Sequence, residues 1–337
     1  MNTGKIIPIA FPDTFVRYSD EFVLNYIFPY IGLGRNKHIK AGHTLLLLIE
    51  NKTGNIEYFD FGRYVTPKGM GRVRSGNTDA ELQIPIDAKI EADKIINLEE
   101  ILIWLEYHPQ KTHGTGRMIA SVCDTIDYDK ALGFLLNLQS QGSVPYMTFG
   151  NTGSNCSRLV ADTFINSLTD SLKAKKLKKN SLFTPSPLGN IKITSTINTI
   201  YHVLDGIVSH YKGNILKENL TNYFDSNVPK VKSKPKLQKK PKGAQLLTGV
   251  GSSAYFKIQV YETAFEIFRY DEHCNLDFKG KFKVDNIKFN IEESYTFIHD
   301  SNCEYCHIKQ GETIYRFDIT TEKEIEKLQL INSERSA

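Results

Sequence analysis

Hydrophobic and polar positions follow a β-hairpin pattern in the first part of the chain. Residues 42–64 read "GHTLLLLIENKTGNIEYFDFGRY", with two apolar runs on either side of "NKTG". Gly54 in that turn can adopt the positive φ that tight hairpin turns require. The unbroken apolar run from Leu45 to Ile49 indicates a strand covered on both faces, and therefore a central strand of its sheet.

Helical periodicity dominates the region after this hairpin. One apolar stretch between the helical ones, "GRMIASVCDTI" at residues 116–126, favours a strand. The helix that begins at "SNCS" has Ser154 or Asn155 as its N-cap and carries its lysines at the C-terminal end, where the helix dipole favours them. The spacing predicts helices over residues 96–108, 127–141, 154–176 and 198–211.

The pattern changes to aromatic and β-branched alternation near the C-terminus, in "AYFKIQVYETAFEIFRY" and "ESYTFIHD". This pattern predicts a small, mostly antiparallel domain of about five strands, with a helix over 320–331. A segment with three prolines, seven lysines and no apolar periodicity precedes it and is typical of an extended linker. We therefore predict a first domain over residues 1–227, a linker over 228–245 and a β-rich accessory domain over 246–337.

Composition is that of a globular protein, with 40% hydrophobic and 24% charged residues among 337. No apolar run approaches the roughly 20 residues that a membrane span needs, and the opening residues do not resemble a secretory signal. We expect a cytoplasmic protein. Twelve lysines lie in two short segments, 172–180 and 229–242, so the net charge of the remainder is 4 − 12 = −8. Nucleic-acid binding is therefore not expected, because no aromatic residues are interleaved with these lysines.

Five cysteines in a chain of this length are not a disulfide framework, and an odd number leaves one thiol unpaired. The string "CEYCH" contains Cys303, Cys306 and His307, which resemble half of a zinc site. A single C-x-x-C is a weak signal, so we predict no metal site and no cofactor, with these three residues as the candidate ligands if one exists.

The stretch "PYMTFGNTGSNCSRLVADTF" at residues 145–164 carries the strongest chemical signal. Cys156 falls in the first turn of a predicted helix, where free backbone N–H groups and the helix dipole stabilise a thiolate. The same N–H groups can bind an oxyanion, and the hydroxyl of Tyr146 is a candidate second donor. The alternative is a cysteine that packs as a small buried hydrophobe.

A thiol nucleophile requires a base, and His43 is the best candidate among nine histidines because it begins the buried strand. If residues 51–54 form the turn, residue 45 lies opposite residue 60. Strand alternation then places Asp60 on the same face as His43, where it can orient the ring. A slip of one residue would bring Glu57 or Arg63 across instead. The alternative role for Asp60 is a partner for the basic loop that follows it.

These residues carry a resemblance to the NlpC-type papain-like cysteine peptidases. In that family Pro-Tyr and a glycine-bearing loop lead to Asp-Cys-Ser at a helix start. Here the Gly-His strand precedes the cysteine by about 110 residues, which is similar to the circularly permuted branch that includes YiiX-like proteins and lecithin:retinol acyltransferase. That branch also uses an Asn-Cys entry, as at Asn155. More loosely, "FDFGRY" after the hairpin looks like a bacterial family.

The resemblance implies an α+β fold in which an antiparallel sheet packs on the helix that bears the nucleophile. It implies hydrolysis of an amide in a peptide or peptidoglycan-type substrate, through a thioester acyl-enzyme. We therefore expect Cys156, His43, Asp60 and Tyr146 to be catalytic, and Asn155 and Arg63 to bind substrate. The alternatives are a thioesterase or acyltransferase for lipid-like esters, and a non-catalytic scaffold. The C-terminal domain would bind substrate or a protein partner.

Overall fold

The computed structural model describes residues 2–150, 152–180, 185–229, 239–261, 264–284 and 288–320. These residues fall into two compact units. The first unit comprises residues 1–62, 71–76 and 82–230, and the second comprises residues 63–70, 77–81 and 231–337. The linker predicted for residues 228–245 lies partly outside the described residues, so it stays a prediction together with the domain boundaries.

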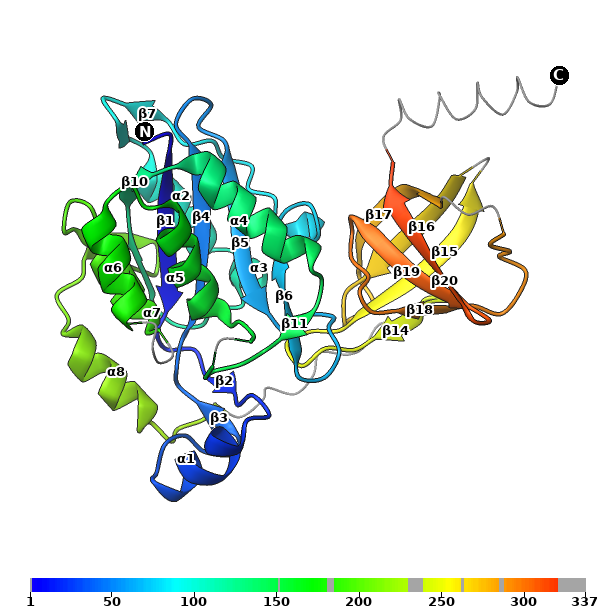
Figure 1. Cartoon of the computed structure of the whole chain (residues 1–337), viewed down its shortest axis with the longest axis horizontal. Coiled ribbons are helices and arrows are strands. Elements are labelled where there is room, and N and C mark those ends of the chain that lie inside the picture. The colour runs from blue at the N-terminus through cyan, green and yellow to red at the C-terminus, as the bar shows by residue number, and fades with distance from the viewer. Residues whose placement is uncertain are drawn as a thin grey trace. The chain divides into compact units, whose positions relative to one another are not determined.

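A nine-stranded antiparallel sheet forms the centre of the first unit (Figure 1). Its strand order is β11-β6-β5-β4-β1-β9-β12-β13, with β10 also paired to β1. Both β1 and β4 are almost completely buried, which confirms that the Leu45–Ile49 run is central. The strands are β1 (Gly4–Phe11), β4 (His43–Glu50), β5 (Ile56–Gly62), β6 (Met70–Arg74), β9 (Met118–Ser121), β10 (Cys123–Ile126), β11 (Val144–Pro145), β12 (Ile200–Leu204) and β13 (Ile207–His210).

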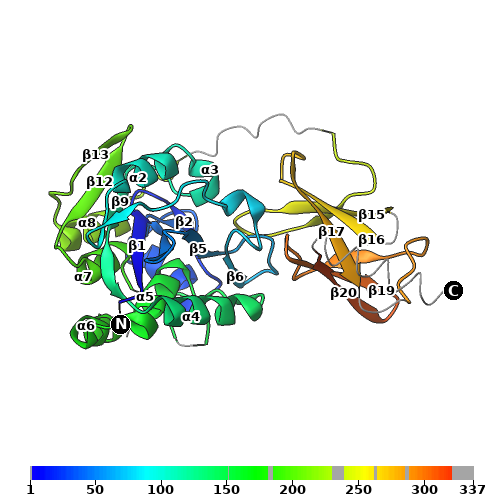
Figure 2. The same ribbon diagram turned by 90° about the horizontal axis from the view of Figure 1, so that it is seen from above.

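Helices cover both faces of this sheet, as Figure 2 shows. One face of β4 presents Leu45, Leu47 and Ile49 to α2 (Leu98–Glu106), and α3 (Pro109–Thr112) follows α2 along the chain. The other face presents Leu46 and Leu48 to α4 (Tyr128–Ser140) and α5 (Cys156–Ser167), with α6 (Ser171–Asn180) packed beside them. Successive side chains of β4 thus pack into two separate hydrophobic cores, one on each face of the sheet. This is why every residue from Leu45 to Ile49 is apolar.

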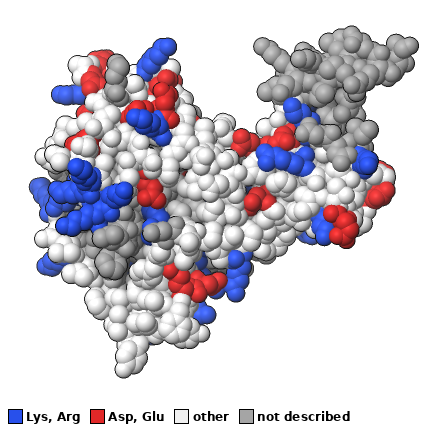
Figure 3. Space-filling model, viewed as in Figure 1, with Lys and Arg blue, Asp and Glu red and all other residues white. Residues whose placement is uncertain are grey.

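The remaining elements of the first unit are short. They are β2 (Val16–Arg17), η1 (Val23–Ile27), α1 (Phe28–Tyr30), β3 (His38–Ile39), β7 (Ile90–Glu91), β8 (Lys94–Ile95), α7 (Pro187–Thr194) and α8 (Ile215–Tyr223), while η2 (Ala80–Leu82) crosses the unit boundary. The lysines of α6 form a basic patch on the face seen in Figure 3. Among the described helices, none combines the length and the apolar character needed to cross a bilayer.

The predicted hairpin register is confirmed. Leu45 lies opposite Asp60 in the β4–β5 ladder, and the amide of Glu50 donates to the carbonyl of Asn55 across the turn (3.2 Å). Gly54 has a φ of +75°, and a Cβ there would lie 2.2 Å from the carbonyl oxygen of Ala88. A glycine is therefore required both by the turn and by this close approach.

Two predicted helices are wrong. The helix expected over 154–176 is interrupted after Ser167, because Thr169 pairs with the backbone of Thr125 and Asp170 caps a new helix through the amides of residues 172 and 173. The helix expected over 198–211 is the β12–β13 hairpin. Asp205 and Gly206 both have positive φ there, which is the conformation of a two-residue hairpin turn and which the Asp-Gly pair signals.

The second unit contains a seven-stranded sheet in the order β14-β15-β16-β17-β20-β19-β18. Its two end strands are linked by Gln245, which receives the amide of Phe297 (2.8 Å) and donates to the carbonyl of Tyr295 (3.1 Å), so the sheet is nearly closed like a barrel. The strands are β14 (Gln245–Leu247), β15 (Ala254–Tyr261), β16 (Ala264–Tyr270), β17 (Leu276–Val284), β18 (Thr296–Ile298), β19 (Tyr305–Gln310) and β20 (Thr313–Ile319). The sequence predicted about five; β14 and β18 are too short for alternation to reveal them.

Residues 63–70 and 77–81, which follow the β4–β5 hairpin in sequence, belong to this second unit. The amide of Val65 donates to the carbonyl of Ser252, and the buried guanidinium of Arg269 pairs with Asp79 and Glu81. The two loops are thus part of the second unit's own packing. The helix predicted over 320–331 lies, apart from residue 320, outside the described residues.

Candidate active site

Cys156 is the first residue of α5, as the sequence predicted. Asn155 is the N-cap: its side-chain oxygen accepts the amide of Arg158 (2.9 Å), and its side-chain nitrogen donates to the carbonyl of Met147 (2.8 Å). These two bonds fix the loop before the helix against the helix itself. Both polar atoms of the Asn155 side chain are therefore already hydrogen-bonded within the protein. Its role in binding substrate stays a prediction.

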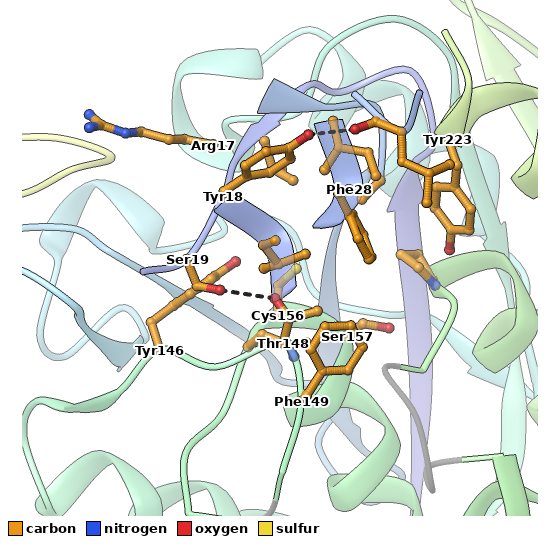
Figure 4. Close-up of a pocket in the computed structure, with 18 of the residues that line it drawn as sticks. Arg17, Tyr18, Ser19, Phe28, Tyr146, Thr148, Phe149, Cys156, Ser157 and Tyr223 are labelled. Atoms are coloured by element: carbon orange, nitrogen blue, oxygen red, sulfur yellow. Dashed lines mark hydrogen bonds between the residues drawn. The ribbon is translucent and has the colours of Figure 1, made fainter. Parts of the chain in front are cut away.

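The thiol of Cys156 lies in the wall of a cavity of about 340 Å³, and the side chain is only 7% exposed (Figure 4). Burial raises the pKa of the Cys156 thiol to about 11, although backbone N–H groups of Thr44 and Ser157 lower it. The negative charge of Asp60 raises it further. The N–H groups at the helix start thus favour the thiolate as expected, but desolvation outweighs them and the net pKa of the thiol is raised.

His43 begins β4, directly after Gly42, which has a φ of +77°. The imidazole lies on the Asp60 face of the sheet, with Nε2 4.0 Å from Oδ2 of Asp60. That nitrogen is buried and has no hydrogen-bond partner within the described residues. Burial lowers the pKa of His43 to about 4; Asp60 raises it and Arg74 lowers it. The ring is therefore neutral at pH 7, which is the form that can accept a proton.

Asp60 is fully buried and is bound by other groups than His43. Arg74 donates to both of its oxygens, from Nε to Oδ1 (2.9 Å) and from Nη2 to Oδ2, and the hydroxyl of Tyr58 donates to Oδ2 (2.8 Å). Burial raises the pKa of the Asp60 carboxyl, but the charge and hydrogen bonds of Arg74 outweigh burial and hold it below the ordinary value. Asp60 thus binds an arginine of the basic segment that follows it, which is the alternative role expected from the sequence, although this segment is strand β6 and not a loop. Its carboxylate still faces His43.

Cys156 and His43 lie at the same end of β4, on opposite faces of the sheet. The backbone N–H of Thr44, the residue after His43, lies near enough to the thiol to lower its pKa. The helix that carries Cys156 packs on the Leu46 face, whereas His43 shares the face of Leu45 and Asp60. No hydrogen bond joins the thiol to the imidazole in the part of the chain that is described. Proton transfer between them requires the ring or the thiol to move.

The other predicted site residues are placed differently. Tyr146 lies in the cavity wall and stacks on Phe61, with ring centroids 6.0 Å apart. Arg63 belongs to the second unit, so its predicted role in the site stays a prediction. Glu57 lies opposite Leu48 and accepts a hydrogen bond from Tyr128, which removes it as an alternative to Asp60.

The candidate zinc ligands are engaged with the protein. The thiol of Cys306 donates to the carbonyl of Asn302 (3.3 Å), and Cys303 accepts from Arg269 (3.4 Å). The ring of His307 lies 2.6 Å from the carbonyl of Asp300. Among the described residues, no group of three or more His, Cys, Asp or Glu side chains has an arrangement that could hold a metal ion.

The cavity beside Cys156 is mainly apolar, and residues without a predicted role form most of its wall. The segment between β1 and β4 closes over the cysteine, with Leu24 and Phe28 turned inward at helical spacing, a signal visible in "FVLNYIF". Figure 4 shows Tyr18 and Tyr223 on the far side of the cavity from Phe149. The walls include Tyr18, Leu24, Phe28, Leu33, Phe149 and Tyr223.

The first unit is thus a mixed helix-and-sheet fold with a buried thiol at a helix start, beside a strand that begins with histidine. Residues 6–172 match the family model described as "Type VI secretion system effector TseH-like", and this match includes His43, Asp60, Tyr146 and Cys156. Residues 244–320 match the model described as "DUF6695 C-terminal domain". The crystal structure of the type VI secretion system effector TseH is 17% identical, covering 63% of this chain and 99% of that chain, with a TM-score of 0.41. No curated protein matches the chain.

Proposed function

We propose that the first unit is a cysteine hydrolase of the permuted papain-like type, with Cys156 as nucleophile and His43 as general acid and base. The observation that carries the proposal is the position of the thiol. It is the reactive group of an apolar cavity, at a helix start, beside the strand residue that follows His43. A cysteine that only packs would not require a cavity at its sulfur.

The proposed reaction has two steps. The sulfur attacks the substrate carbonyl carbon while His43 takes the thiol proton and passes it to the leaving group, which departs and leaves a thioester. Water then attacks the thioester carbonyl carbon while His43 takes a proton from the water. The C–S bond breaks, the carboxylic acid leaves, and His43 returns the proton to the sulfur. The amides at the start of α5 would bind the oxyanion in both steps. The pKa values of about 11 and about 4 mean that both groups are neutral before substrate binds.

The apolar wall favours a substrate with an apolar acyl group. An apolar cavity of about 150 Å³ holds one benzene molecule, so about 340 Å³ has room for a group of roughly twice that size, such as a medium-length aliphatic chain. This supports the ester or thioester alternative over a polar peptide amide. Asp60 is proposed to act on His43 as a positioning residue, through the 4.0 Å approach to Nε2.

The experiment is a chain-length series of p-nitrophenyl acyl esters, from acetyl to dodecanoyl, with p-nitrophenol release followed together with the intact mass of the protein. We expect fastest release at medium length, a transient mass increase equal to the acyl group, and loss of both in Cys156→Ser. The matched control is Cys123→Ser, another buried thiol of the first unit, which should behave like the wild type. Equal release by Cys156→Ser and the wild type would overturn the proposal.

The same series separates the alternatives. Equal turnover of octanoyl p-nitroanilide and the octanoyl ester would assign an amidase with the same acyl selectivity. A non-catalytic binding protein would show no acyl adduct with any substrate, and would bind an apolar ligand as tightly with Cys156→Ser as without it. His43→Ala should slow formation of the acyl-enzyme at least 100-fold if the imidazole takes the thiol proton.

A further inference from the structure

Residues 19–33 form a segment that covers the Cys156 cavity, which we call the cap segment. Its helical part is η1 (Val23–Ile27) continuing into α1 (Phe28–Tyr30). The inner face of this segment is apolar and lines the cavity through Leu24, Phe28 and Leu33. The inner face is apolar because it forms part of the wall of the apolar cavity.

The outer face of the cap segment is also apolar, and nothing in the first unit explains it. Tyr30 is 91% exposed, Tyr26 is 69% exposed and Phe22 is 68% exposed, and Ile31 adds a further exposed side chain. Residues 22–34 contain no charged residue. In Figure 3 the part of the surface formed by α1 is a projection without charge. Contiguous exposed apolar surface of this kind marks an interaction site.

Charges flank this outer face on both sides. Arg17 precedes the cap segment, and Arg35 and Lys37 follow it; all three are exposed. The one exposed acidic residue in the same region is Asp20. A short apolar and aromatic face bordered by basic side chains is the composition of a segment that lies in the surface of an anionic lipid layer.

The side chains of Glu21 and Ser19 bind the cap segment to the loop that precedes α5. Glu21 accepts the amides of Thr148 (2.6 Å) and Phe149 (2.9 Å), and the hydroxyl of Ser19 lies 3.2 Å from that of Thr148, as the dashed line in Figure 4 shows. These contacts are polar and local. The inner face of the cap segment also packs against Phe149 of this loop through Leu24 and Phe28.

We propose that the outer face of the cap segment docks on an anionic lipid surface, and that an apolar acyl chain enters the Cys156 cavity from that surface. The segment is too short to span a bilayer, so it lies at the interface. A lipid layer accounts for both faces of the segment, since it covers the outer face and supplies the chain that the inner face encloses. A protein partner accounts only for the outer face. This inference rests on the proposed function.

The test is flotation of the full-length protein with vesicles of phosphatidylglycerol, compared with vesicles of phosphatidylcholine. We expect binding to the anionic vesicles, weaker binding to the zwitterionic ones, and at least a tenfold loss in Tyr26→Ser/Tyr30→Ser. These two side chains do not line the cavity. The matched control is Leu216→Ser/Leu220→Ser on α8, which removes two apolar side chains of the same unit that are 70% and 52% exposed, and it should bind like the wild type.

Two results would overturn the inference. One is vesicle binding that survives Tyr26→Ser/Tyr30→Ser. The other is a wild-type protein that does not bind vesicles but forms a dimer in sedimentation experiments, where the double variant is a monomer. That result would make a second copy of the chain the partner of this face. The proposed function fails separately, because Cys156→Ser should bind vesicles as the wild type does. Binding without hydrolysis would reject the hydrolase and keep the docking surface.

Discussion

Nε2 of His43 lies 4.0 Å from Oδ2 of Asp60, while Arg74 and Tyr58 hold that carboxylate. The distance is too long for a hydrogen bond. Asp60 therefore forms its direct ion pair with the buried guanidinium of Arg74, and it acts on the imidazole of His43 only across a longer distance. Its two roles can be separated experimentally, because one affects stability and the other affects the pH at which His43 works.

Asp60→Asn should reduce the free energy of unfolding by about 3–5 kcal/mol, because it leaves the buried guanidinium of Arg74 without its negative partner. The measurement is urea unfolding at pH 7. The double variant Asp60→Asn/Arg74→Met removes both charges and should be more stable than Asp60→Asn alone. A single variant as stable as the wild type would mean that water reaches this pair.

His43 should make folding stability depend on pH between 6.5 and about 4. In that window the unfolded chain binds a proton at His43 and the folded protein does not, so stability falls as pH falls through it. Between pH 7.5 and pH 4.5 this amounts to about 2–3 kcal/mol.

The measurement compares urea unfolding of the wild type and His43→Gln at both pH values. Other groups titrate in both proteins, so the difference between the two pH-dependent losses isolates His43. A loss as large in His43→Gln as in the wild type would show that the ring exchanges with solvent.

Alkylation of Cys156 by iodoacetamide should accelerate about tenfold per pH unit between pH 7 and pH 9.5, because only the thiolate reacts and its pKa is raised to about 11. Peptide mapping identifies the modified thiol. Cys303, whose pKa burial raises to about 12, should react more slowly at every pH. A rate for Cys156 that levels off below pH 9 would show a thiol activated in the free protein, as the helix position alone suggested.

Glu21→Gln should raise the alkylation rate of Cys156 by about fivefold to tenfold at pH 8, because hydrogen bonds to a charged group contribute about 1.5–3 kcal/mol and their loss loosens the cap segment. Asp20→Asn changes the neighbouring exposed carboxylate and should leave the rate unchanged. Equal rates in both variants would mean that the cap segment does not limit access to the thiol.

Local patterns in the sequence were sufficient for the β4–β5 hairpin, its register and the start of α5. The reason is that Gly54 and the N-cap Asn155 act within a few residues of their own position, so their effect can be read from neighbours. The same is true of the two faces of β4. At residues 198–211 the apolar periodicity predicted a helix, but Asp205 and Gly206 form the turn of the β12–β13 hairpin.

The tertiary structure alone decided the chemistry of these residues. The pKa values of Cys156 and His43 depend on burial. The cavity around Cys156 is formed by segments far away in the chain, including the cap segment and Tyr223. Arg74 reaches Asp60 only because β6 pairs with β5. The sequence thus determined which groups stand at the end of β4. Their protonation and the apolar cavity beside them follow from packing between distant segments, which no spacing along the chain specifies.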